Sequence, residues 1–206
     1  MDWNTVLREF IALWVVIDPI GSVPVFIAVT AGLSAAHKRS IAIKAVMISI
    51  CILLFFLIAG QLLLEALKIH LQAFQIAGGI VLFLFALTMI FGESKIEEEK
   101  KQISGSTSHL AVCPLAVPSL ASPGAMLAVV MLTDNHRHSV TEQLFTAGAM
   151  IAVLLSTLVL FFLAAPIQRL IGDAGASIVS RVMGLVLASV AVDNILSAIT
   201  SYFGIT

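Results

Sequence analysis

Long apolar runs separated by short polar stretches make up almost the whole chain. Each run reaches the ~20 residues that a helix needs to cross a bilayer. The longest polar connection covers residues 93–109, near the middle of the chain. The pattern predicts an all-α membrane protein with six transmembrane helices, at residues 6–32, 41–66, 72–92, 110–133, 144–165 and 178–200.

The polar connection at 93–109 separates two halves, residues 1–92 and 110–206, that resemble each other. The stretch GSVPVFIAVT (21–30) aligns without gaps on GAMLAVVMLT (124–133), and the first Gly and the final Thr coincide. Gly21 and Gly78 are 57 positions apart, while Gly124 and Gly184 are 60 apart. Because each half has an odd number of spans, the second half must enter the membrane from the opposite side. The sequence therefore predicts two inverted three-helix repeats, an architecture that recurs in secondary transporters.

Helix-breaking residues interrupt the first and the fourth predicted spans. A proline inside a helix removes a backbone hydrogen bond and clashes with the preceding turn, and glycine adopts angles that other residues avoid. An unwound turn in lipid persists only where protein or a watery cavity satisfies its polar groups. We therefore expect helices 1 and 4 to be broken at their centres, around Asp18, Pro19, Gly21 and Pro24 in one and Pro118, Ser122, Pro123 and Gly124 in the other.

These breaks form the candidate binding site. After each break a second half-helix would begin near the midplane, capped by Ser122 in one half and by Ser22 in the other. Such amide ends bind anions, and Asp18 would supply the complementary charge for an ammonium group, H⁺ or Na⁺. The expected substrate-binding residues are Asp18, Pro19, Gly21, Ser22, Pro24, Pro118, Ser122, Pro123 and Gly124.

Asp193 and its neighbour Asn194 form a second polar position within an apolar run. Ionisable groups at membrane depth are expensive and are usually functional or paired. We expect a role in ion coupling or substrate binding, with a hydrated position near the membrane surface as the alternative. For the two breaks, the alternative is that their prolines and glycines only kink the helices or allow close packing.

Composition supports a lipid environment, since 60% of the residues are hydrophobic and 11% are charged. A net charge of −1 offers no basic field for nucleic acid, and no His/Cys cluster has metal-ligand spacing, so neither a metal nor a cofactor is expected. With the N-terminus outside, eight Lys and Arg residues would face the cytoplasm and three the exterior. The positive-inside rule then predicts both termini outside, which is the periplasm in a bacterial inner membrane.

Three motifs together resemble the MarC/SnatA family of integral membrane proteins, over essentially the full length. They are DPIGSVPVF (18–26), IAGGIVLFLFAL (76–87) and PLAVPSLASPGAM (114–126). Ser22 stands where the family usually has Asn, and Ser122 where it often has Gly. The resemblance implies a six-helix inner-membrane protein related to the LysE-type exporters. It further implies ion-coupled transport of small neutral amino acids such as glycine and alanine.

Secondary transport of a small-molecule substrate, coupled to H⁺ or Na⁺, is thus the leading hypothesis, and no enzymatic activity is expected. An exporter of other small metabolites or weak acids is the first alternative, and a non-transporting membrane subunit is another. A membrane-embedded hydrolase would need a Ser–His, paired-acid or metal constellation at depth. Asp18 with Asp193 is the one acid pair that the predicted spans offer.

Overall fold

The computed structural model describes residues 3–91, 111–133 and 139–204, and every secondary-structure element in these ranges is a helix. The first half contains α1 (Trp3–Ile17), α2 (Ser22–Val29), α3 (Ala35–Ala66) and α4 (Leu71–Phe91). The second half contains the π-helix η1 (Ala111–Leu120), followed by α7 (Pro123–Leu132), α8 (Val140–Phe162) and α9 (Ala164–Phe203). The all-helical class predicted from the sequence is confirmed for these residues.

Five segments of the described chain are long and apolar enough to cross a membrane: Leu7–Ile27, Ala35–Ala66, Leu71–Phe91, Val140–Phe162 and Ser177–Phe203. The segment predicted at 110–133 differs from these five. It is divided into η1 and α7, and α7 is a shorter apolar helix of ten residues. The polar connection predicted at 93–109 lies outside the described residues.

The gaps between predicted spans at residues 33–40 and 166–177 are largely helical. Residues 35–40 form the first turns of α3, where the side chain of Ser34 accepts the backbone N–H of His37. The semi-polar stretch after Arg169 is part of α9, which turns sharply at Gly172 (φ 64°, ψ 179°). Glycine adopts this left-handed φ without the steric cost that a Cβ imposes. The polar residues at both places therefore extend helices at the ends of membrane spans.

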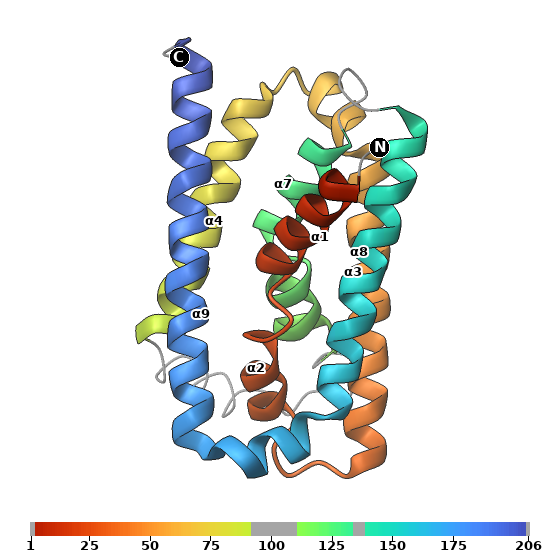
Figure 1. Cartoon of the computed structure of the whole chain (residues 1–206), viewed down its shortest axis with the longest axis vertical. Coiled ribbons are helices and arrows are strands. Elements are labelled where there is room, and N and C mark those ends of the chain that lie inside the picture. The colour runs from red at the N-terminus through yellow and green to blue at the C-terminus, as the bar shows by residue number, and fades with distance from the viewer. Residues whose placement is uncertain (1–2, 92–110, 134–138, 205–206) are drawn as a thin grey trace.

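The four short helices α1, α2, η1 and α7 lie between two pairs of long helices (Figure 1). On one side α3 and α8 contact each other, and on the other side α4 packs along α9. Glycines allow this second contact, since a Cβ on Gly79 would lie 2.6 Å from Ile195 and one on Gly184 would lie 2.9 Å from Ile90. Gly79 is thus a packing residue, and the long pairs enclose the interrupted helices.

Candidate functional site

The first interruption falls at the predicted position. α1 ends at Ile17 and α2 begins at Ser22, with Asp18 between them in a left-handed conformation (φ 51°). Pro24 is the third residue of α2, in its first turn, where the missing N–H removes no intrahelical hydrogen bond. The Asp-Pro-x-Gly segment therefore ends one helix and starts the next, and both the aspartate and Pro19 are buried.

Asp18 caps the amide end that follows it. Its Oδ1 accepts the backbone N–H of Gly21 at 2.9 Å, and its carbonyl accepts the N–H of Ser22 at 3.1 Å. The predicted capping role of Ser22 is wrong, because α2 already begins at this residue. The Ser22 hydroxyl instead donates to the Asp18 carbonyl at 2.8 Å. The carboxylate thus occupies the electropositive end of its own half-helix.

The second interruption uses a serine cap. Ser122 precedes α7 in an extended conformation, and its Oγ accepts the N–H of Ala125 at 3.0 Å. Pro123 is the first residue of α7, as the sequence predicts. Before the break, the N–H of Ala121 reaches back five residues to the carbonyl of Ala116 at 2.8 Å, which continues the wide π-type turn of η1. Pro118 belongs to η1, but its side chain lies outside what the structure describes.

Hydrogen bonds join the two breaks directly. The hydroxyl oxygens of Ser22 and Ser119 are 3.0 Å apart. Ser122 donates to the carbonyl of Val16 at 3.3 Å, within the last turn of α1, where backbone carbonyls lack intrahelical partners. The structure therefore brings together the two segments that the sequence singled out, although about a hundred residues separate them.

The meeting point of the breaks is tightly packed. Asp18, Ser22, Ser119 and Ser122 are each no more than 4% exposed. Gly124 packs here as well, since a Cβ on it would lie 2.7 Å from Leu82 and 3.2 Å from Val16. The polar groups of the site bond to one another in this conformation, so a ligand would have to replace the contacts that the chain makes with itself.

The family model for MarC family integral membrane proteins matches residues 3–203. The chain belongs to the MarC family. It is 30% identical over 207 residues to the UPF0056 membrane protein YvbG of Bacillus subtilis, covering 98% of both chains. It is 29% identical to the UPF0056 membrane protein YhcE of Escherichia coli, over 98% of this chain and 95% of that one. A UPF0056 membrane protein of Methanocaldococcus jannaschii is 32% identical, over 97% and 98%. No solved structure matches.

In this MarC-family protein, the two acids of the predicted spans differ in burial. Asp193 is exposed on α9, whereas Asp18 is buried where α1 gives way to α2. Asn194 is half-buried and lines a cavity of about 360 Å³ together with Val16 and Leu127, which belong to α1 and α7. Of the two polar neighbours, it is therefore Asn194 that faces the interrupted helices.

Two polar contacts of this MarC-family protein were not predicted from the sequence. Ser119 was overlooked because a single serine beside a proline carries no signal until its partner, Ser22, is known. Glu9 lies within the first predicted span without a partner assigned from the sequence, yet it is only 6% exposed and its Oε2 accepts a hydrogen bond of 2.8 Å from Thr146. Its place among apolar residues at the start of a membrane span was the available clue.

Proposed function

We propose that this MarC-family protein is a secondary transporter of small neutral amino acids, such as glycine and alanine, across the bacterial inner membrane. The observation that carries the proposal is the junction of two interrupted helices, at which Ser22 contacts Ser119 and Asp18 caps Gly21. Interrupted helices that meet inside a membrane protein commonly form the substrate and ion sites of transporters.

The packing of the helices supports an inverted repeat as the basis of movement. If η1, α7, α8 and α9 correspond to α1, α2, α3 and α4, several contacts between the halves form matching pairs. α1 packs on α8 as η1 packs on α3, and α4 packs on α7 as α9 packs on α2. In Figure 1, α2 and α7 extend in opposite directions from the level of the breaks. Rocking of one repeat against the other would expose this level to each side in turn.

The chemistry of the junction fits a zwitterion. The amide ends of α2 and α7 are electropositive and suit a carboxylate, while Asp18 is an anion that suits an ammonium group. Both ends are now capped by the chain, through Asp18 at Gly21 and through Ser122 at Ala125. A solute carboxylate would replace Asp18 at the Gly21 N–H, and the freed Asp18 would bind the ammonium group or the coupling H⁺ or Na⁺.

The orientation proposed from loop charges places both termini in the periplasm. The start of α1 and the end of α9 lie at the same end of the molecule, and the start of α3 lies at the other (Figure 1). The first turns of α3 contain Lys38 and Arg39. This arrangement agrees with a cation-rich cytoplasmic face.

Uptake into proteoliposomes tests the proposal. Purified protein is reconstituted, a H⁺ or Na⁺ gradient is imposed, and labelled alanine is followed with and without excess glycine. We expect gradient-dependent uptake that glycine inhibits and that a hydrophobic cation leaves unchanged. Equal uptake by protein-free liposomes would contradict transport.

An exporter of other metabolites or weak acids is the second candidate, since the amide ends would bind any small carboxylate. Inhibition of alanine uptake by lactate as strong as that by glycine would favour this candidate, because lactate lacks the ammonium group that Asp18 would bind. A non-transporting subunit would show no uptake of any solute, and it would tolerate Asp18→Asn.

A further inference from the structure

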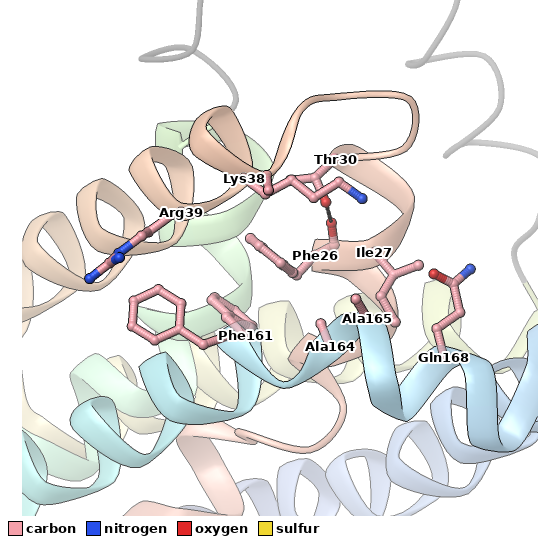
Figure 2. A pocket seen from close by; sticks show the side chains of 11 residues that line it. Phe26, Ile27, Thr30, Lys38, Arg39, Phe161, Ala164, Ala165 and Gln168 are labelled. Atoms are coloured by element: carbon pink, nitrogen blue, oxygen red, sulfur yellow. Dashed lines mark hydrogen bonds between the residues drawn. The ribbon is translucent and has the colours of Figure 1, made fainter.

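A cavity of about 430 Å³ lies at the end of the molecule where α2 ends and α3 begins. Its apolar wall is formed by Phe26 and Ile27 of α2, Phe161 of α8 and Ala164 of α9. The rings of Phe26 and Phe161 stack with centroids 4.4 Å apart and planes within 7°. Figure 2 shows this stack below the side chains of Lys38 and Arg39, which diverge from neighbouring positions of α3.

The cavity lies at the level expected for lipid headgroups. α3 has 32 residues, and at 1.5 Å per residue it is about 48 Å long, well beyond the ~30 Å hydrocarbon core. The polar first turns of α3, which contain Lys38 and Arg39, therefore extend past the core. On the opposite wall, residues 164–171 of α9 run across this end of the molecule before the chain turns at Gly172 (Figure 1).

The charges around the cavity favour an anion. Lys38 and Arg39 line it, and within the described residues its lining contains no acid. The Arg39 guanidinium lies 5.5 Å from the centre of the Phe162 ring, a cation–π distance that holds the charge at the rim. Two cations above an apolar, aromatic wall match an anionic headgroup attached to an acyl chain.

We propose that this cavity binds an anionic phospholipid of the surrounding leaflet. The phosphate lies at the rim of the cavity, where the flexible side chains of Lys38 and Arg39 turn toward it, and part of one acyl chain packs against Phe26 and Ile27. Basic pockets between membrane helices bind acidic lipid headgroups by this combination of charge and apolar contact. The lipid contacts α2, α3 and the α8–α9 corner at once, so it joins the end of an interrupted helix to the long helices around it.

Thermal unfolding of the purified full-length protein in neutral detergent tests the proposal, because a ligand of the folded state raises its apparent stability. The probes are phosphatidylglycerol, phosphatidylcholine with the same chains, and glycerol 1-phosphate without chains. We expect stabilisation by phosphatidylglycerol alone. The Lys38→Gln/Arg39→Gln variant should bind phosphatidylglycerol more weakly, by about fivefold for each cation removed.

A charge-matched control is Arg8→Gln/Lys68→Asn, which removes two cations at the other end of the molecule and should keep the full shift. Ala165→Trp retains both cations but places a large ring in the cavity, and it should abolish the shift. If the Lys38→Gln/Arg39→Gln variant does not fold, Ala165→Trp serves as the test in its place. Equal stabilisation by both lipids, an unchanged response of both cavity variants, or an equal effect of glycerol 1-phosphate would each overturn the proposal.

Discussion

The hydroxyl oxygens of Ser22 and Ser119 lie 3.0 Å apart in the interior, although the two residues are 97 positions apart in the chain. Each belongs to a helix that borders a break, so this single hydrogen bond joins the two interrupted helices. In a membrane interior such a bond has no competing water, and each hydroxyl serves as the buried partner of the other.

We predict that Ser22→Ala and Ser119→Ala are coupled. Each single substitution leaves the other hydroxyl without this partner and should lower the free energy of unfolding by about 1 kcal/mol. The double variant should lose clearly less than the sum, because both partners of one bond are gone. Unfolding of the four proteins in mixed micelles measures the coupling. Strict additivity would show that the two hydroxyls act independently.

Asp18→Asn should preserve the fold but not the function. The asparagine side-chain oxygen can still accept the Gly21 N–H, and asparagine tolerates the left-handed φ of this position. We therefore expect a melting temperature close to that of the wild type. The variant should show neither the stabilisation by alanine nor the gradient-driven uptake that we expect of the wild type. If the variant retained both responses, Asp18 would not be part of the binding site.

Gly21→Ala should separate the Asp18 carboxylate from the backbone N–H of residue 21. A Cβ on Gly21 would overlap the Asp18 carboxylate, so the carboxylate would have to leave the Gly21 N–H. We expect a loss of about 1–3 kcal/mol in the free energy of unfolding, the cost of an unpaired buried group. Gly148→Ala is the matched control, because its Cβ meets nothing within 4 Å and it lies in helix α8. That change should stabilise the protein by about 0.5–1 kcal/mol. Equal effects of the two substitutions would argue against a close contact at Gly21.

Thr146→Val should destabilise the contact between α1 and α8. It removes the donor to the buried Glu9 carboxylate while keeping the shape of the side chain. The expected cost is about 1–3 kcal/mol, measured by unfolding in detergent. Thr146→Ser keeps the hydroxyl and should cost less. If Thr146→Val and Thr146→Ser were equally stable, the hydrogen bond to Glu9 would not contribute to the stability of the fold.

Sequence patterns predicted the parts of this fold that depend on local chemistry. Apolar run length located the long helices, and Pro19, Pro123 and their glycines located both breaks, because these residues act on the backbone of their own segment. Contacts over long distances in sequence were not accessible in this way. The Ser22–Ser119 and Glu9–Thr146 bonds depend on how the helices pack, and so does the exposure of Asp193. The capping role of Asp18 was missed because it requires a left-handed backbone that sequence does not specify.

The closure of the Asp18 carboxylate onto Gly21 has a consequence for energy coupling. On the proposed mechanism, an incoming anion that takes over this amide evicts the aspartate, so occupancy of the junction and the appearance of an uncompensated negative charge become one event. A cation must then neutralise it, because a bare carboxylate at that depth is prohibitively costly. That cation is the ammonium group of the same solute, or H⁺ or Na⁺ where the solute brings only a carboxylate. On this mechanism a zwitterion carries its own counter-charge to Asp18, whereas a simple carboxylate crosses only together with a coupling ion.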